Sequence, residues 1–369
     1  MENIMIIFNR HMLRTVFMLT VLTVLFTCPA YPCTRVLWNN NGKAIVVGRN
    51  MDWFEDTKGH LWVLPRGIQR DGRAGKNSLT WTAKYGSLIA TAYDSMTVDG
   101  LNEKGLNANM LWLTESDYGK RDESLPGISF SLAPQYFLDN FETVDDAVRF
   151  VQTKPFQVVA GPIASTNKIS SVHFSLADAN GDSAIIEYIN GKTIIHHDRS
   201  YTVMTNSPPF SEQLANLKQY KMFGGAKDLP GDEKPIDRFV RAVRYLESLP
   251  KPEKIRNTIA YLLSLMRNVS QPFGISDPLR PYVSPTRSRS VINLTKRIYF
   301  FESTNSANII WVYLDKFQLK EGSPVLKLDL TNELDLVDEF DLVGDATEKF
   351  NQSKPFEFQE GIVGNQGHR

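Results

Sequence analysis

The sequence contains little cysteine and has no net charge. Only two cysteines occur in 369 residues, which excludes a disulfide-stabilised scaffold. Lys and Arg together number 41, and so do Asp and Glu, so neither sign is in excess to attract nucleic acid. We therefore expect no nucleic-acid partner. With 42% hydrophobic and 22% charged residues, the chain has an ordinary globular composition and can bury a large core.

The N-terminal region contains an uncharged apolar run that is too short to span a bilayer. Its twelve residues, 15–26, follow a basic segment at 10–14 and precede small residues near Ala30, an order typical of a signal peptide. We predict that residues 1–32 are a signal peptide with a short pro-segment. The protein is then periplasmic or secreted, with no membrane segment after removal. The alternatives are a buried N-terminal helix and a lipoprotein signal ending at Cys28.

Removal of this segment would leave Cys33 as the only cysteine and as the first residue. A single cysteine cannot form an internal disulfide, so its thiol is either free or paired between chains. An N-terminal α-amine titrates near ~7.7 and can act as a general base for its own side chain. The thiol of Cys33 is therefore a candidate nucleophile.

A β-hairpin is predicted directly after Cys33. Asn41-Gly42 separates two strand-like segments, 34–40 and 43–49, and is typical of a two-residue hairpin turn. In that register Cys33 lies opposite Asn50.

Two charged residues follow on the second strand of this hairpin. Asp52 is predicted on the same face as Cys33, within side-chain reach. A regular strand points Arg49 to the other face, unless a bulge at Gly48 redirects it. A guanidinium beside the thiol would lower the pKa of the thiol, and Asp52 could hold the amine. The alternative is a structural ion pair between Arg49 and Asp52 that supports a turn.

The rest of the chain has blocks of strand-like and helix-like segments joined by hairpin signals. This pattern predicts an α+β fold, with antiparallel sheets and helices packed outside them. Residues 332–369 are polar and are expected to form a surface extension or a frayed tail. The main strand-like segments are 169–177, 183–189, 192–197, 201–206, 297–303, 308–314 and 324–330, and the helix-like segments are 128–139, 143–153, 237–248 and 255–267.

Motifs of other hydrolases are missing. There is no H-E-x-x-H zinc motif and no G-x-S-x-G nucleophile motif. His196 and His197 are neighbours on a predicted strand, so they face opposite ways and cannot bind one metal ion together. We expect one of them in the core and one on the surface.

Several segments spread over the chain form a recognisable set. They are CTR (33–35), VVGRNMDW (46–53), VLPRG (63–67), DGLNEKGLNANMLWL (99–113), AIIEYINGK (184–192), VMTNSPPF (203–210), LPGDEKPIDRFVRA (229–242), MRNVSQPFG (266–274) and YFFEST (299–304). Together they resemble the choloylglycine hydrolase family, which contains bile salt hydrolases and penicillin V acylases, and the signal peptide resembles its Gram-negative branch. The resemblance implies an N-terminal nucleophile hydrolase with a four-layer αββα fold, a single domain over residues 33–369, and no metal or cofactor.

The resemblance also implies the site residues. Cys33 matches the nucleophile of the family, and Arg49 and Asp52 match the pair beside it. Asn206 matches a side chain that binds the oxyanion, and Arg238 matches the remaining arginine of the site.

Further site features follow from the same resemblance. The backbone N–H of Trp112 matches the second oxyanion donor. The indole side chain of Trp112 makes the pocket wall differ from that of Gram-positive members. Trp53, Leu111, Trp112 and Leu113 are expected to line an apolar acyl pocket. The interval from Asn206 to Arg238 is shorter than in Gram-positive members, so their tetramer contact does not carry over, although a homo-oligomer stays possible.

The implied activity is hydrolysis of a linear amide C–N bond in a small-molecule substrate. Bile salts conjugated to glycine or taurine are the first candidate substrates. Penicillin V and N-acyl-homoserine lactones are the alternatives. A third possibility is a catalytically silent exported binding protein in which the amine of Cys33 is never released.

Overall fold

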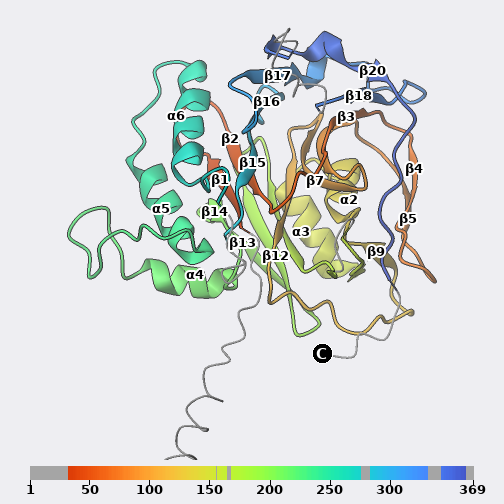
Figure 1. The fold of residues 1–369 in the computed structure, drawn as a ribbon. Helices are drawn as coiled ribbons and strands as arrows, with labels where there is room; N and C mark the ends of the chain where they lie inside the picture. Colours follow the sequence, from red (N-terminus) through yellow and green to blue (C-terminus); the bar gives the residue numbers. More distant parts are fainter. Residues whose placement is uncertain (1–31, 155, 164–167, 276–282, 331–341, 363–369) are drawn as a thin grey trace, which may run out of the picture.

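The computed structural model describes residues 32–154, 156–163, 168–275, 283–330 and 342–362. The predicted signal peptide therefore lies outside the described residues, apart from Pro32. Two β-sheets face each other at the centre of the described part, and helices cover the outer side of each sheet (Figure 1).

The first sheet carries the N-terminal hairpin at its centre. All neighbouring strands are antiparallel except the last pair, which is parallel. In spatial order the strands are β14 (Val203–Met204), β1 (Cys33–Trp38), β2 (Val46–Asp52), β15 (Thr286–Asn293), β16 (Ile298–Ser303), β17 (Ile309–Tyr313) and β19 (Gly344–Asp345).

The second sheet is antiparallel throughout. Two small two-stranded sheets lie beside it: β4 (Gln69–Asp71) with β5 (Thr80–Thr82), and β9 (Gly127–Ser129) with β10 (Gln157–Val159). In spatial order the second sheet consists of β13 (Lys192–His197), β12 (Ser183–Ile189), β11 (Val172–Ala177), β8 (Asn107–Trp112), β7 (Met96–Asn102), β6 (Ser87–Ala92), β3 (Leu61–Leu64), β18 (Leu326–Leu328) and β20 (Asn351–Gln352).

The helices form the two outer layers. On the first sheet, α5 (Pro235–Ser248) and α6 (Ile255–Asn268) pack on the central strands, and α4 (Phe210–Leu217) packs on α5. On the second sheet, α2 (Ala133–Asn140) and α3 (Val144–Thr153) pack on the opposite outer face (Figure 1). The predicted four-layer arrangement is thus present. Short 3-10 helices occur at Leu314–Lys316 and Thr347–Lys349.

Local sequence signals account for several of these helices. Thr143 caps α3 as predicted, because its hydroxyl accepts a hydrogen bond from the backbone N–H of Asp146. Helix α2 starts later than the sequence predicted, since 127–129 pair with β10 as a strand instead. Strand β15 and helix α4 were not predicted at all.

The register of the N-terminal hairpin differs from the prediction by one residue. Cys33 lies opposite Met51 rather than Asn50, because the strands are joined by a seven-residue loop, 39–45, and not by a two-residue turn. The buried side chain of Asn41 closes this loop with four hydrogen bonds to its backbone. A one-residue shift moves every side chain of one strand to the other face, so the predicted faces are wrong.

Gly48 allows a helix to pack closely on the sheet and does not form a β-bulge. The pairing of β1 with β2 runs through Gly48 without a register shift, so the predicted bulge is wrong. A Cβ atom at this position would lie 2.7 Å from Cγ of Met266 on α6. The missing side chain therefore allows α6 to approach the sheet closely, and Arg49 keeps the direction of a regular strand.

The described part of the C-terminal extension, 342–362, packs on the domain and is not a frayed tail. Strand β20 pairs with β18, and the ring of Phe356 lies 5.1 Å from that of Trp62. Phe358 is buried, so the extension adds aromatic surface to the core that its polar composition did not predict.

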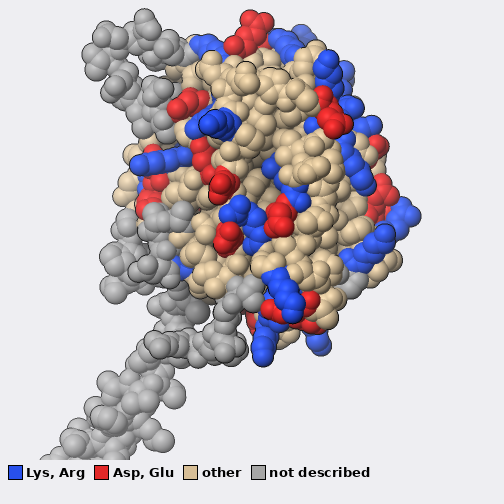
Figure 2. Space-filling model, turned by 90° about the vertical axis from the view of Figure 1, so that its right-hand side faces the viewer, with Lys and Arg blue, Asp and Glu red and all other residues tan. Residues whose placement is uncertain are grey.

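The surface carries both signs of charge. Figure 2 shows a face on which Lys and Arg side chains are mixed with Asp and Glu side chains, in line with the balanced totals of the sequence. Within the described ranges, we find no helix of the length and apolarity needed to cross a membrane.

Candidate active site

Cys33 begins β1 in the interior of the first sheet. Its residue is only 4% exposed, and its thiol lies 3.8 Å from the carbonyl oxygen of Asp52. Its backbone nitrogen donates a hydrogen bond of 2.5 Å to the side-chain oxygen of Asn206. Burial raises the pKa of the Cys33 thiol, and the positive charge of Arg49 opposes that shift. The thiol therefore needs a base beside it in order to ionise.

The observed register decides which groups surround the thiol. Cys33 and Arg49 share the face that looks toward the second sheet, where Arg49 donates to the carbonyl oxygen of Met110 at 3.0 Å. Asn50 and the carboxylate of Asp52 lie on the opposite face, toward the helices. This is the reverse of the prediction, which placed Asp52 on the face of Cys33.

Arg238 on α5 binds the start of β1 from the helix side. It is fully buried, and it donates to the carbonyl oxygen of Cys33 at 2.8 Å, to the side-chain oxygen of Asn206 at 3.0 Å, and to the hydroxyl of Thr34. One of its nitrogens also lies 3.7 Å from the carboxylate of Asp52. A single guanidinium thus contacts the backbone of Cys33, the side-chain amide of Asn206 and the carboxylate of Asp52 together.

Asp52 pairs with Arg238 and not with Arg49 among the described residues, so the alternative of an Arg49–Asp52 ion pair is wrong. Thr286 donates its hydroxyl to the carboxylate at 2.5 Å. Burial raises the pKa of Asp52 to about 6, against the opposing effects of Arg238 and Thr286. No motif in the sequence pointed to Thr286, which reaches the site because β15 is the neighbour of β2.

Asn206 brings the two predicted oxyanion donors together. Its side-chain oxygen is occupied by the backbone N–H of Cys33 and by Arg238, so the NH₂ end of the amide faces the other way. That NH₂ group donates to the carbonyl oxygen of Trp112 at 2.8 Å. The side chain of Asn206 and the backbone of Trp112 therefore lie next to each other, close to the thiol.

Cys33 lines an apolar pocket. The rings of Trp53 and Trp112 form part of its wall, with centroids 6.2 Å apart, and Leu111 lines it as predicted. Leu113 does not line it and is buried in the core, which corrects that prediction. Side chains that the sequence analysis missed complete the wall, among them Tyr93, Met96, Met110, Phe130, Ile163 and Val172.

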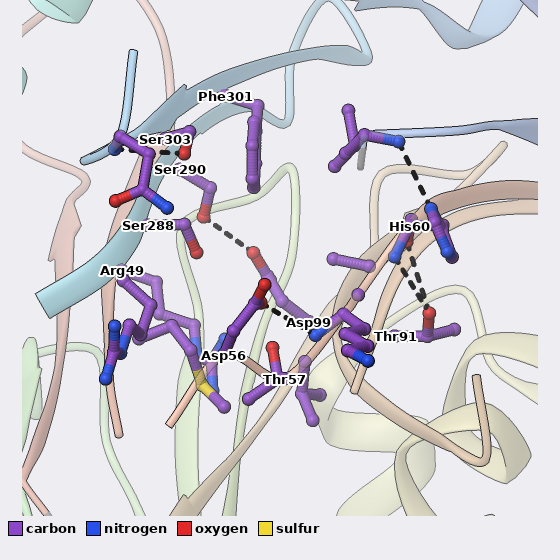
Figure 3. A pocket seen from close by; sticks show the side chains of 18 of the residues that line it. Arg49, Asp56, Thr57, His60, Thr91, Asp99, Ser288, Ser290, Phe301 and Ser303 are labelled. Atoms are coloured by element: carbon purple, nitrogen blue, oxygen red, sulfur yellow. Dashed lines mark hydrogen bonds between the residues drawn. The ribbon is translucent and has the colours of Figure 1, made fainter. Parts of the chain in front are cut away.

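A second, polar chamber adjoins this pocket between the two sheets (Figure 3). This chamber shares Arg49, Met51, Thr57 and Val98 with the apolar pocket. Serine hydroxyls from β15 and β16, with Asp56, Asp99 and His60 from the other side, face this chamber. Arg49 thus stands between an apolar and a polar compartment.

Metal ligands do not gather in the part of the chain that the structure describes. No cluster of three or more His, Cys, Asp or Glu side chains there could hold a metal ion.

Residues 33–334 match the model of the family described as linear amide C–N hydrolases, choloylglycine hydrolase family. The chain belongs to this family. It is therefore a hydrolase that acts on linear amides, and the predicted α+β fold of the N-terminal nucleophile hydrolase type is confirmed.

This chain is similar to proteins from three bacteria, and it covers nearly the whole length of each. The penicillin V acylase of Pectobacterium atrosepticum is 40% identical over 373 residues, which is 95% of this chain and 98% of that protein. The solved structure of the penicillin V acylase from Agrobacterium tumefaciens has a TM-score of 0.80 and 46% identity, covering 89% of this chain and all of that one. A bile salt hydrolase/transferase of Clostridium perfringens is 26% identical over 316 residues, 78% of this chain and 94% of that protein.

The raised pKa of Asp52 predicts an acidic limb in the pH profile of the enzyme. Below about pH 6 the carboxyl takes up a proton and loses its ion pair with Arg238, so kcat/KM should fall as the pH drops through 6. An Asp52→Asn variant should have a lower kcat/KM and should lack this acidic limb. The control variant Asp198→Asn, which changes an exposed carboxylate, should keep the limb. A limb that persists unchanged in Asp52→Asn would assign it to another group.

The raised pKa of Asp52 affects stability in the opposite direction, so measurements of activity and of stability against pH can be told apart. Between pH 3.8 and about pH 6, the carboxyl of Asp52 is protonated in the folded protein but largely ionised in the unfolded chain. The contribution of Asp52 to the free energy of unfolding therefore decreases as the pH rises. The expected combination is therefore a loss of activity toward acid pH together with a contribution of Asp52 to the melting temperature that increases.

Proposed function

We propose that this protein is an exported cysteine acylase that removes an aromatic acyl group from a small linear amide, with penicillin V as its model substrate. The observation that carries the proposal is the position of Cys33: its nitrogen donates a hydrogen bond to Asn206, and the residue lines a pocket walled by aromatic rings.

The reaction uses groups that this site brings together. The α-amine of Cys33 takes the thiol proton, and the thiolate attacks the amide carbonyl carbon. The oxyanion receives hydrogen bonds from the NH₂ of Asn206 and the backbone N–H of Trp112. The α-ammonium then protonates the leaving nitrogen, the C–N bond breaks, and water hydrolyses the thioester to release the acid and the free thiol.

The charged residues have separate tasks in this scheme. Arg49 lies on the thiol's face, and its positive charge favours the thiolate, which burial disfavours. Arg238 and Asp52 act from the helix side, where they fix the backbone of Cys33 and the side chain of Asn206. They therefore orient the nucleophile rather than touch the reacting carbonyl.

The acyl preference rests on the pocket and on the relatives. Rings of Trp53, Tyr93, Trp112 and Phe130 offer an aromatic acyl group flat apolar surface. The penicillin V acylases are 40% and 46% identical to this chain, whereas the bile salt hydrolase/transferase is 26% identical. We therefore rank penicillin V before conjugated bile salts, which reverses the order expected from the sequence. Long-chain N-acyl-homoserine lactones are a further candidate.

Maturation to an N-terminal Cys33 is part of the proposal. The match to the family begins at Cys33, and a signal peptide is expected over residues 1–32. Export and removal of this segment would convert the nitrogen that binds Asn206 into the α-amine that the reaction needs.

Two measurements on one preparation test this proposal. We expect the intact mass of active protein to start at Cys33, and kcat/KM to be highest for penicillin V among penicillin V, a taurine-conjugated bile salt and a long-chain acyl-homoserine lactone. Full activity in protein that begins at Ala30 or Tyr31 would refute the N-terminal base. A higher kcat/KM for the bile salt would refute the acyl preference. No turnover of any of the three by protein beginning at Cys33 would favour the silent binding protein.

A further inference from the structure

The segment that carries Asn206 is held from behind by buried polar side chains outside the reaction site. This segment, the Asn206 turn (residues 205–210), connects β14 to α4. His173 on β11 and Glu187 on β12 lie behind it, and each side chain is only 1% exposed. Neither residue was singled out by the sequence, and neither takes part in the acyl transfer.

His173 binds the first residue of the Asn206 turn. Its Nε2 donates to the carbonyl oxygen of Thr205 at 2.9 Å, because a carbonyl oxygen can only accept. Its Nδ1 lies 3.3 Å from a carboxylate oxygen of Glu187. The imidazole thus joins the carboxylate of Glu187 to the peptide that links Thr205 to Asn206.

Glu187 binds the last residue of the same turn. The oxygen that faces His173 also accepts the backbone N–H of Phe210 at 3.0 Å, and the other oxygen lies 3.2 Å from Nε2 of His196. Burial raises the pKa of Glu187, but hydrogen bonds from His173 and His196 outweigh it and hold the pKa at about 2. The group is therefore a buried carboxylate at neutral pH, tied to both ends of the turn.

Gln213 on α4 closes the turn from a third side. Its NH₂ group donates to the carbonyl oxygens of Asn206 at 2.5 Å and Pro208 at 2.6 Å, and its side-chain oxygen accepts the hydroxyl of Thr205 at 2.8 Å. The backbone of the turn is therefore fixed at both ends and in the middle. The freedom left to Asn206 is the direction of its side chain, which Cys33, Arg238 and Trp112 determine.

From this geometry we propose that His173 and Glu187 are positioning residues that act through the carbonyl of Thr205 and the N–H of Phe210 to hold Asn206 where its NH₂ group meets the oxyanion. A buried carboxylate is costly unless it is fully hydrogen-bonded, and here all its described partners lead to this turn or to His196. The inference rests on the proposed function, because it assumes that Asn206 binds the oxyanion.

Two substitutions at His173 separate its two hydrogen bonds. An Asn side chain places its NH₂ near the position of Nδ1, and a Gln side chain places it near Nε2. His173→Asn should therefore keep the contact with Glu187 and lose the one with Thr205, and His173→Gln should do the reverse. We expect His173→Asn to lower kcat by about 10- to 100-fold, since a small misplacement of a catalytic group has effects of that size. KM should stay within a few-fold, and His173→Gln should recover most of kcat.

A matched control exists on β13 of the same sheet, which pairs with the strand that carries Glu187. His197 on β13 pairs with Asp182 at 2.7 Å, but it is exposed and leads away from the Asn206 turn. His197→Asn should therefore keep the wild-type kcat. Should His173→Asn fail to fold, Glu187→Gln keeps the size of the side chain and removes its charge, and it should also lower kcat with KM nearly unchanged.

A crystal structure of His173→Asn or Glu187→Gln gives a readout that does not depend on the substrate. We expect the distance from the Asn206 side-chain oxygen to the nitrogen of Cys33 to lengthen beyond hydrogen-bonding range. An Asn206 that stays in place with a normal kcat would overturn the inference. Equal losses of kcat in His173→Asn and His173→Gln would also overturn it, because the Thr205 contact would then be irrelevant. If the wild type hydrolyses none of the amides, the proposed function fails, and the position of Asn206 in the variant still decides the positioning role.

Discussion

A Cys33→Ser variant is expected to lose most of its kcat, with an upper limit of about 10⁶-fold, the loss that follows removal of a nucleophile from an otherwise intact site. The reason is acidity: an α-amine that titrates near ~7.7 can take a proton from a thiol, whose ordinary pKa is about 8.5, far more readily than from a serine hydroxyl. Single-turnover kinetics and the mass of a trapped acyl-enzyme on the wild type measure this effect directly.

Thiol labelling gives the control for this prediction. Cys33 is the free cysteine of the described chain, and it lines the apolar pocket, so iodoacetamide should add one label and stop turnover together. A bound aromatic acid should protect the thiol if the pocket accepts the acyl group. Full activity after stoichiometric labelling of Cys33 would exclude the thiol as the nucleophile.

An Asn206→Ala variant is expected to lower kcat by about 10²–10³-fold, which is about 2.7–4 kcal/mol of barrier. The NH₂ group of Asn206 gains most when negative charge develops on the carbonyl oxygen, so KM should change much less than kcat. An Asn206→Asp variant should be as slow or slower, because a carboxylate would repel the oxyanion. Steady-state kinetics of both variants test this.

Asn206 also has a structural role that the experiment must separate from catalysis. Its oxygen accepts from Arg238, so truncation leaves part of a buried guanidinium without its partner and should lower the melting temperature. The melting temperature and kcat therefore need to be measured on the same preparation. A well-folded Asn206→Ala protein with a normal kcat would remove Asn206 from the reaction.

The two variants together test the order of events in the site. In the proposed reaction, Cys33→Ser removes the thiolate that forms the thioester, and Asn206→Ala leaves that thiolate in place but slows its attack. We therefore expect slow formation of a thioester acyl-enzyme in Asn206→Ala and no thioester in Cys33→Ser.

Much of the fold followed from short-range signals in the sequence. Thr143 and the apolar spacing after it predicted α3, and the periodicity of 255–267 predicted α6, because caps and helical period act within a few residues. The Asn190-Gly191 turn likewise predicted the β12–β13 hairpin. Helix α4 and strand β15 were not predicted from the sequence, because the residues that bury them lie far away in the chain.

The sequence by itself determined the candidate nucleophile, the family resemblance and the identity of five residues that the fold gathers: Cys33, Arg49, Asp52, Asn206 and Arg238. It did so because a lone cysteine after an apolar leader and a set of local motifs are readable without geometry.

Only the tertiary structure decided how those residues face one another. The loop closed by Asn41 shifted the hairpin by one residue, and since side chains alternate along a strand, Arg49 rather than Asp52 came to share the face of the thiol. Arg238 and Thr286 reach the site from elements far from Cys33 in the chain, and His173 reaches the Asn206 turn behind it. Such contacts depend on which strands and helices become neighbours, which is a property of packing between distant segments and leaves no local pattern in the sequence.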